Sequence, residues 1–197
     1  MSLLPEDLME GERVLLSKGA NFVISSAEYG LSPYAHSALL DRMGLKGKEA
    51  LGGHLHVTNL RIVFQSHAAN RITGRLSIFM PEINELANES SALVKRLRVR
   101  TVETDETFVI WGVNDVIDTI ELAQGHWKET DTATLWAQLV NQPASLGQGI
   151  QYAPIMDRLV RHDTEIAKDV VDIISNPLGI ATAYHLIGLY RQLTADD

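Results

Sequence analysis

Residues 53–64 constrain the fold more than any other part of the chain. Apolar and polar side chains alternate there around Thr58-Asn59, which is typical of two antiparallel strands joined by a two-residue turn. With that turn, Val57 pairs with Leu60 and Leu55 pairs with Ile62. The alternation places five apolar side chains on one face: Leu55, Val57, Leu60, Ile62 and Phe64. The sequence therefore predicts an antiparallel sheet with one buried face.

Similar strand patterns lie on both sides of this hairpin. Residues 12–26 read as one or two strands, and residues 75–80 as another that ends at Pro81. A second hairpin is expected from residues 93–102 and 107–113 around Thr104-Asp105, with Leu97, Val99, Phe108 and Ile110 facing inward. The period then changes from two to 3.6. Asn114 is placed to cap a helix whose apolar stripe is Val116, Ile117, Ile120 and Ala123.

The last third of the chain carries helical patterns only. They cover about residues 132–142, 154–175 and 178–193, and a further short helix is expected at 36–43 within an irregular stretch. We therefore divide the chain into a domain at residues 1–130 and a helical extension at residues 131–197.

Composition removes several classes of function. The chain has no cysteine, which excludes disulfides, thiolate catalysis and cysteine-ligated metals. Its net charge of −8 makes it a poor general nucleic-acid binder. The N-terminus lacks the features of a signal peptide, and no apolar run approaches the ~18 residues of a membrane span. We expect a cytoplasmic protein, which leaves peripheral attachment to a membrane open.

Taken in order, these segments resemble a GRAM domain, a member of the pleckstrin-homology (PH)-like superfold. The residues that carry the resemblance are Gly11-Glu12 with Val14-Leu15, the run from Gly53 to Ser66 with its Val-Thr-Asn-x-Arg-Ile-x-Phe core, Leu76–Ile78, Leu97–Thr101 and the helix after Asn114. The resemblance covers about residues 11–125.

The resemblance implies an α+β protein: a PH-like antiparallel β-barrel of seven strands, capped by a C-terminal helix and followed here by a helical extension. It also implies a module that binds membrane lipids or proteins, and no enzyme, although fold alone does not give function. The chain departs from the family in the length of residues 27–52 and in the turn at 103–106, which lacks glycine.

An arginine row is the main candidate for a binding site. Arg96, Arg98 and Arg100 alternate with apolar residues, so they share one strand face and suit phosphate or carboxylate groups. The hairpin register above puts Arg98 opposite Trp111, close enough for a cation–π contact, and Arg61 could extend the patch. The alternative is an exposed face that is solvated or neutralised by neighbouring glutamates.

Metal and cofactor chemistry find little support. His54 and His56 share a strand face at a spacing that metal sites use, but the expected register places Arg61 beside His56, and a cation disfavours a divalent metal there. We expect two surface histidines, no metal and no cofactor. No catalytic motif assembles.

The final helix offers a second candidate surface. Residues 178–193 are apolar on nearly every face, so the helix needs a cover. It either packs against its own domain or forms an interface with another chain, with Leu178, Tyr184, Ile187 and Tyr190 as contacts. The leading hypothesis is thus a non-catalytic module that docks an anionic lipid headgroup or a protein. The alternative is a scaffold that forms complexes or homo-oligomers through its C-terminal helices.

Overall fold

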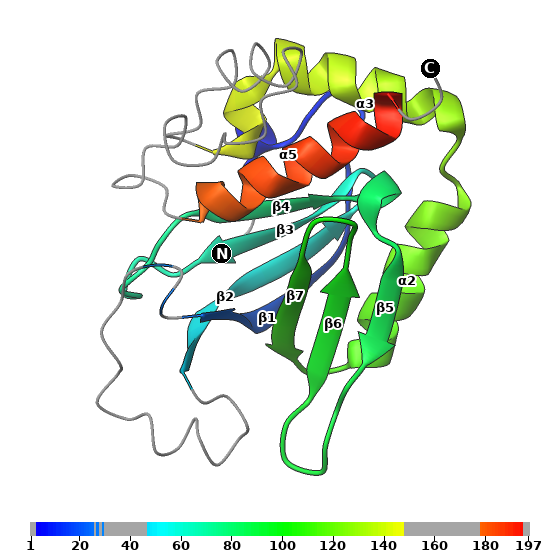
Figure 1. Ribbon diagram of the computed structural model, residues 1–197. Helices are drawn as coiled ribbons and strands as arrows, with labels where there is room; N and C mark the ends of the chain where they lie inside the picture. Colours follow the sequence, from blue (N-terminus) through cyan, green and yellow to red (C-terminus); the bar gives the residue numbers. More distant parts are fainter. Residues whose placement is uncertain (1–2, 26, 28, 30–46, 148–177, 195–197) are drawn as a thin grey trace.

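Seven antiparallel strands form one sheet in the computed structural model, which describes residues 3–25, 27, 29, 47–147 and 178–194 (Figure 1). The strands are β1 (Val14–Ser25), β2 (Lys48–Thr58), β3 (Arg61–Ser66), β4 (Arg75–Phe79), β5 (Glu85–Asn88), β6 (Arg96–Arg100) and β7 (Asp105–Ile110). Their order is β4-β3-β2-β1-β7-β6-β5. No ladder joins β4 to β5 within the described ranges, so the seven-stranded antiparallel sheet is confirmed and a closed barrel is not.

The predicted core face of the first hairpin is confirmed. Leu55, Val57, Ile62 and Phe64 are at most 1% exposed and pack with inward residues of β1, β4, β6 and β7. Helix α2 (Val113–Gly125) lies against this face and contributes Val116 and Ile120 to the same cluster. The helix begins two residues earlier than predicted, because its N-cap is Gly112 in place of Asn114; the φ of Gly112, 68°, is in the left-handed region that favours glycine.

The turn of the first hairpin differs from the prediction by one residue. Val57 pairs with Ile62 and Leu55 with Phe64, so the turn residues are Asn59 and Leu60. The reason is local hydrogen bonding: the hydroxyl of Thr58 accepts from the backbone N–H groups of Leu60 and Arg61. Leu60 therefore leaves the core face and packs in a second cluster.

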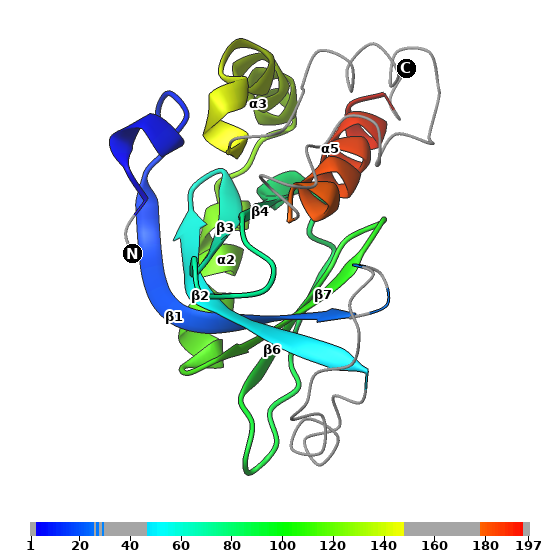
Figure 2. The same ribbon diagram turned by 90° about the vertical axis from the view of Figure 1, so that its left-hand side faces the viewer.

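That second cluster lies on the opposite face of β4. Helices α3 (Glu129–Asn141) and α5 (Gly179–Thr194) pack there with the short η3 turn (Pro143–Leu146), around Phe79 and several leucines (Figure 2). Two further 3-10 turns are η1 (Pro5–Asp7) and η2 (Met80–Glu82). The helices predicted at 132–142 and 178–193 are confirmed, whereas those predicted at 36–43 and 154–175 lie outside the described residues.

Helix α5 also covers the edge of the sheet. The Thr182 hydroxyl accepts a hydrogen bond from the backbone N–H of Ser77 at 3.0 Å and donates one to the carbonyl of Arg75 at 3.3 Å. Both groups belong to β4, an outermost strand, and an unpaired strand edge is a template for aggregation. The helix thus satisfies part of the edge that the sheet leaves open. None of the helices in the described ranges is long and apolar enough to cross a bilayer.

Candidate functional site

The arginine row forms on β6, but the guanidinium groups of Arg98 and Arg100 already have acidic partners. Arg98 donates to Asp105 at 2.7 Å and to Glu89 at 3.2 Å. Arg100 donates to Glu85 at 2.7 Å. The hydrogen bonds from Arg98 hold the pKa of the Asp105 carboxyl below its usual range. These contacts favour the neutralised face over a site that waits for an anion.

Trp111 does not join this row. Arg98 pairs with Thr107 and Arg96 with Val109, so the predicted register that placed Arg98 opposite Trp111 is wrong. The error comes from the turn: the Thr101 hydroxyl accepts hydrogen bonds from the backbone N–H groups of Glu103 and Thr104, which makes the connection longer than the two residues assumed. Trp111 lies beyond β7 and is 78% exposed.

The prediction that Arg61 extends the surface patch is also wrong, because Arg61 is fully buried. Its guanidinium donates to the Glu12 carboxylate at 2.9 and 3.1 Å, and the Glu12 side chain is equally inaccessible. Three more hydrogen bonds reach the Ser77 hydroxyl and the carbonyls of Ser145 and Asp7. All five N–H donors of the guanidinium are thus used, and Arg61 joins the N-terminal segment and η3 to the sheet.

The expectation of two surface histidines holds only in part. His56 is buried, and the hydroxyl of Ser17 lies 2.6 Å from its Nδ1. It pairs with Val63 rather than lying beside Arg61. Burial, helped by the neighbouring His54, lowers the pKa of His56 to about 4, so the imidazole is a weak base for activating Ser17. No cluster of three metal-ligating side chains occurs among the described residues.

A buried acid–base cluster escaped the sequence-based reasoning. His185 of α5 is fully buried, with its Nδ1 3.2 Å from Glu82 Oε1 and its Nε2 3.7 Å from Glu106 Oε1. Burial disfavours the charged imidazole, but the two carboxylates outweigh it and raise the pKa of His185 to about 9. Burial also raises the pKa of Glu82. This cluster attaches α5 to the sheet, and its Glu106 side chain also lines a cavity beside α5 and β7.

Most of the residues predicted as an interface of the final helix pack within the same molecule. Leu178 and Ile187 are buried in the two apolar clusters. Tyr190 is partly buried, with its ring centroid 5.4 Å from that of Trp136, and Tyr184 is 42% exposed. These positions favour the alternative in which the helix covers its own domain.

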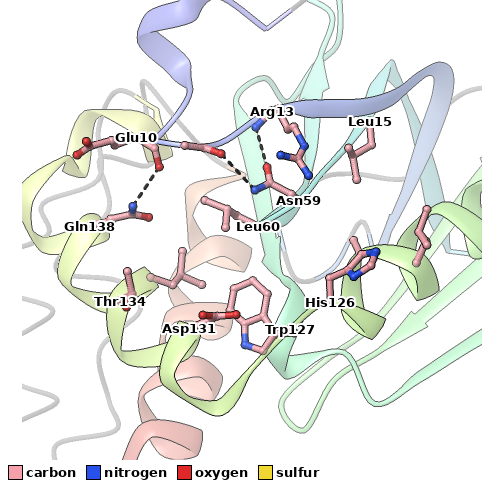
Figure 3. A pocket seen from close by; sticks show the side chains of 14 residues that line it. Glu10, Arg13, Leu15, Asn59, Leu60, His126, Trp127, Asp131, Thr134 and Gln138 are labelled. Atoms are coloured by element: carbon pink, nitrogen blue, oxygen red, sulfur yellow. Dashed lines mark hydrogen bonds between the residues drawn. The ribbon is translucent and has the colours of Figure 1, made fainter.

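A groove between helices α2 and α3 is the best candidate for a binding site (Figure 3). We call it the α2–α3 groove; its volume is about 420 Å³. Its walls come from the residues just before and within β1, the β2–β3 turn, the end of α2 and one side of α3. The lining residues are Glu10, Gly11, Arg13, Leu15, Asn59, Leu60, Leu122, Ala123, His126, Trp127, Asp131, Thr134, Leu135 and Gln138.

Hydrogen bonds hold the walls of the α2–α3 groove in place. The Asn59 side chain accepts from the backbone N–H of Arg13 at 2.7 Å and donates to the carbonyl of Gly11 at 3.2 Å. On the other wall, the Gln138 side chain donates to the carbonyl of Glu10 at 3.0 Å (Figure 3). The Trp127 indole N–H donates to Thr132 at 3.1 Å. The groove is therefore formed before any ligand binds, which lowers the entropic cost of binding.

Charged residues stand at separate places around the α2–α3 groove. Arg13, His126, Glu10 and Asp131 line its rim, and Leu60 lies near its centre (Figure 3). Neither the Arg13 guanidinium nor the Glu10 carboxylate forms an ion pair with any described residue. The groove therefore has an apolar floor, and its rim includes a cation and an anion without an ion-pair partner among the described residues.

Comparison with known proteins gives similarity at the level of fold. No model of a protein family matches the sequence, and no curated protein matches it. A solved structure described as the C-terminal domain of an unknown protein from Leishmania infantum is 18% identical, with a TM-score of 0.41, over 58% of this chain and 86% of that one. The Vps36 N-terminal PH domain is 14% identical, with a TM-score of 0.38, over 60% and 83%. Neither similarity says anything about the ligand, partner or site of this chain.

Proposed function

We propose that this chain is a non-catalytic binding module of the GRAM, PH-like type, and that it docks a segment of a protein in the α2–α3 groove. The observation that carries the proposal is the groove itself: a preformed concavity with an apolar floor and charged residues on its rim. Protein interfaces commonly combine a buried apolar centre with a polar rim. The rim here includes Leu122, which is 62% exposed and has no cover within the described part of the chain.

A lipid headgroup is the weaker of the two ligands that the family resemblance suggests. Anionic headgroups need cations that are free to bind them, and Arg98 and Arg100 are already held by Glu85, Glu89 and Asp105. A lipid would have to displace these carboxylates. A protein segment in the α2–α3 groove displaces none of them.

A second cavity, of about 600 Å³, lies beside α5 and β7 but is less suited to a ligand. Its wall carries Glu103 and Asp105, which already bind Arg191 and Arg98. These two carboxylates are therefore occupied, in contrast to the Glu10 carboxylate of the α2–α3 groove.

Selection from a phage-displayed library of random 12-residue peptides tests the proposal. We expect the full chain to enrich peptides that bind Leu122→Asp roughly 10-fold more weakly or worse, because the contact with one leucine is lost. Val140→Asp is the matched control: Val140 is an exposed aliphatic residue of the neighbouring helix α3 and lies outside the groove. Failure to enrich any peptide, or equal binding to both variants, would contradict the proposal.

Sedimentation with vesicles tests the lipid alternative directly. Vesicles of phosphatidylcholine with a fifth of phosphatidylserine or a phosphoinositide are mixed with wild type and with the triple variant Arg96→Glu, Arg98→Glu, Arg100→Glu. We expect neither protein to sediment with the vesicles. Sedimentation of the wild type alone would favour a lipid headgroup at the arginine row over a protein in the α2–α3 groove.

A further inference from the structure

We propose that the α2–α3 groove receives the β5–β6 loop of a second copy of this chain, with Leu93 as the anchor. The inference rests on the proposed function, because it uses the same groove and names its occupant. It differs from self-association through the C-terminal helices, whose apolar residues are largely used within the molecule.

The β5–β6 loop, residues 89–95, presents one apolar side chain at a convex tip. Leu93 is 92% exposed, which is the highest value among the exposed large apolar residues of the described chain. The loop is held by its own serines: Ser91 N–H donates to the carbonyl of Val94 at 2.8 Å, and Ser90 Oγ accepts from Arg96 N–H at 3.2 Å. A rigid apolar tip loses little freedom when it binds, which favours its use as an anchor.

The charges of the loop fit those of the groove. Lys95 lies two residues from Leu93, and its ammonium group has only a 3.4 Å contact with the carbonyl of Ser91. The groove is lined by two acidic residues, Glu10 and Asp131, and a carboxylate on its rim can pair with this ammonium group while Leu93 occupies the apolar floor.

The two surfaces cannot meet within one molecule. The β5–β6 loop projects from the end of the sheet opposite α3, and both views show this separation (Figures 1 and 2). The groove lies at the α3 end. A loop from one copy must therefore enter the groove of another, in a head-to-tail contact that leaves a free loop and a free groove on each pair.

The contact is small, and this sets the concentration at which association is expected. A stable interface buries roughly 800 Å² on each partner, more than one loop tip supplies. We therefore expect the mass-average molecular weight of the full chain to rise between about 0.05 and 1 mM protein in sedimentation equilibrium.

Complementation between two variants tests the head-to-tail geometry. Leu93→Asp removes the anchor and keeps the groove, whereas Leu122→Asp alters the groove and keeps the anchor. We expect each variant alone to remain monomeric to 1 mM. An equimolar mixture should form 1:1 dimers and nothing larger, because only one type of contact remains. A symmetric interface that either substitution disrupts would not be restored by mixing.

Two control variants distinguish this contact from non-specific hydrophobic association. Val102→Asp, on the exposed β6–β7 turn, matches Leu93→Asp, and Val140→Asp matches Leu122→Asp. Both controls should associate as the wild type does. Any of three results would overturn the inference. The wild type could stay monomeric at 1 mM, Leu93→Asp or Leu122→Asp could associate alone, or their mixture could stay monomeric. If the wild type stays monomeric but its groove binds peptides, the proposed function holds and only the inference of self-association fails.

Discussion

Replacing Arg61 with methionine should destabilise the fold more than any surface substitution. The change leaves the Glu12 carboxylate inside the protein with its countercharge removed, since both side chains are fully inaccessible. Breaking a buried ion pair in this way costs about 3–5 kcal/mol, a large share of the ~5–15 kcal/mol that stabilises a typical domain. Glu12 keeps hydrogen bonds from the Met9 N–H and the Thr58 hydroxyl, at 2.8 and 2.9 Å, which favours the lower part of that range.

Urea unfolding at pH 7 measures this effect. With a slope on the order of 2 kcal/mol per M, the midpoint of Arg61→Met should fall by about 1.5–2.5 M. Adding Glu12→Gln should restore at least about 1 kcal/mol, because the neutral amide removes the stranded charge. Arg100→Met is the control, since Arg100 pairs with Glu85 at 2.7 Å with both side chains exposed, and its loss should cost less than about 1 kcal/mol. A cost for Arg61→Met no larger than the control, or a double variant that shows the sum of two independent losses, would refute the reasoning.

Two further substitutions test close packing and pH dependence. A Cβ on Gly53 would collide with the carbonyl of Gln65 and lie 2.6 Å from the ring of Phe64, so Gly53→Ala should lose about 1–3 kcal/mol of unfolding free energy in thermal melts; a melting temperature equal to that of wild type would contradict this close approach of β2 to β3. Because the pKa of His185 is raised to about 9 from 6.5, its ion pairs stabilise the fold fully below pH ~6.5 and this contribution disappears as the pH rises through 9. The stability difference between wild type and His185→Gln should accordingly shrink between pH 7 and 9.5, and a constant difference would show that the imidazole does not carry the charge.

Local patterns were enough to predict the inner face of the sheet. Alternation in residues 53–64 and 96–110 identifies inward side chains because the period of two is a property of each strand by itself. Most strands and helix α2 follow from that pattern, whereas β5 at Glu85–Asn88 was not located and the total of seven strands came from the family resemblance. The hairpin registers did not follow, because each depends on a threonine hydroxyl that accepts backbone N–H groups: Thr58 in one turn and Thr101 in the other.

The partners of the charged residues could not be predicted. Arg61 binds Glu12 and the carbonyl of Ser145, which lie 49 and 84 positions away. His185 contacts Glu82, which is also distant from it in the sequence. An arginine in an alternating strand reads as a surface residue unless the layer that covers it is known. The same difficulty hides the α2–α3 groove, whose walls come from four separate segments of the chain.

The Thr182 contact with β4 makes the last helix a cover for one edge of the sheet. A chain that ends after Gly125 would lack this cover. Phe79, the Arg61 guanidinium and the backbone edge of β4 would then be exposed to solvent. Such a fragment should aggregate through the exposed edge of β4, and light scattering would detect this as an increase in particle size. The boundary predicted at residue 130 stays a prediction, and the contact of Thr182 with β4 is one that crosses it.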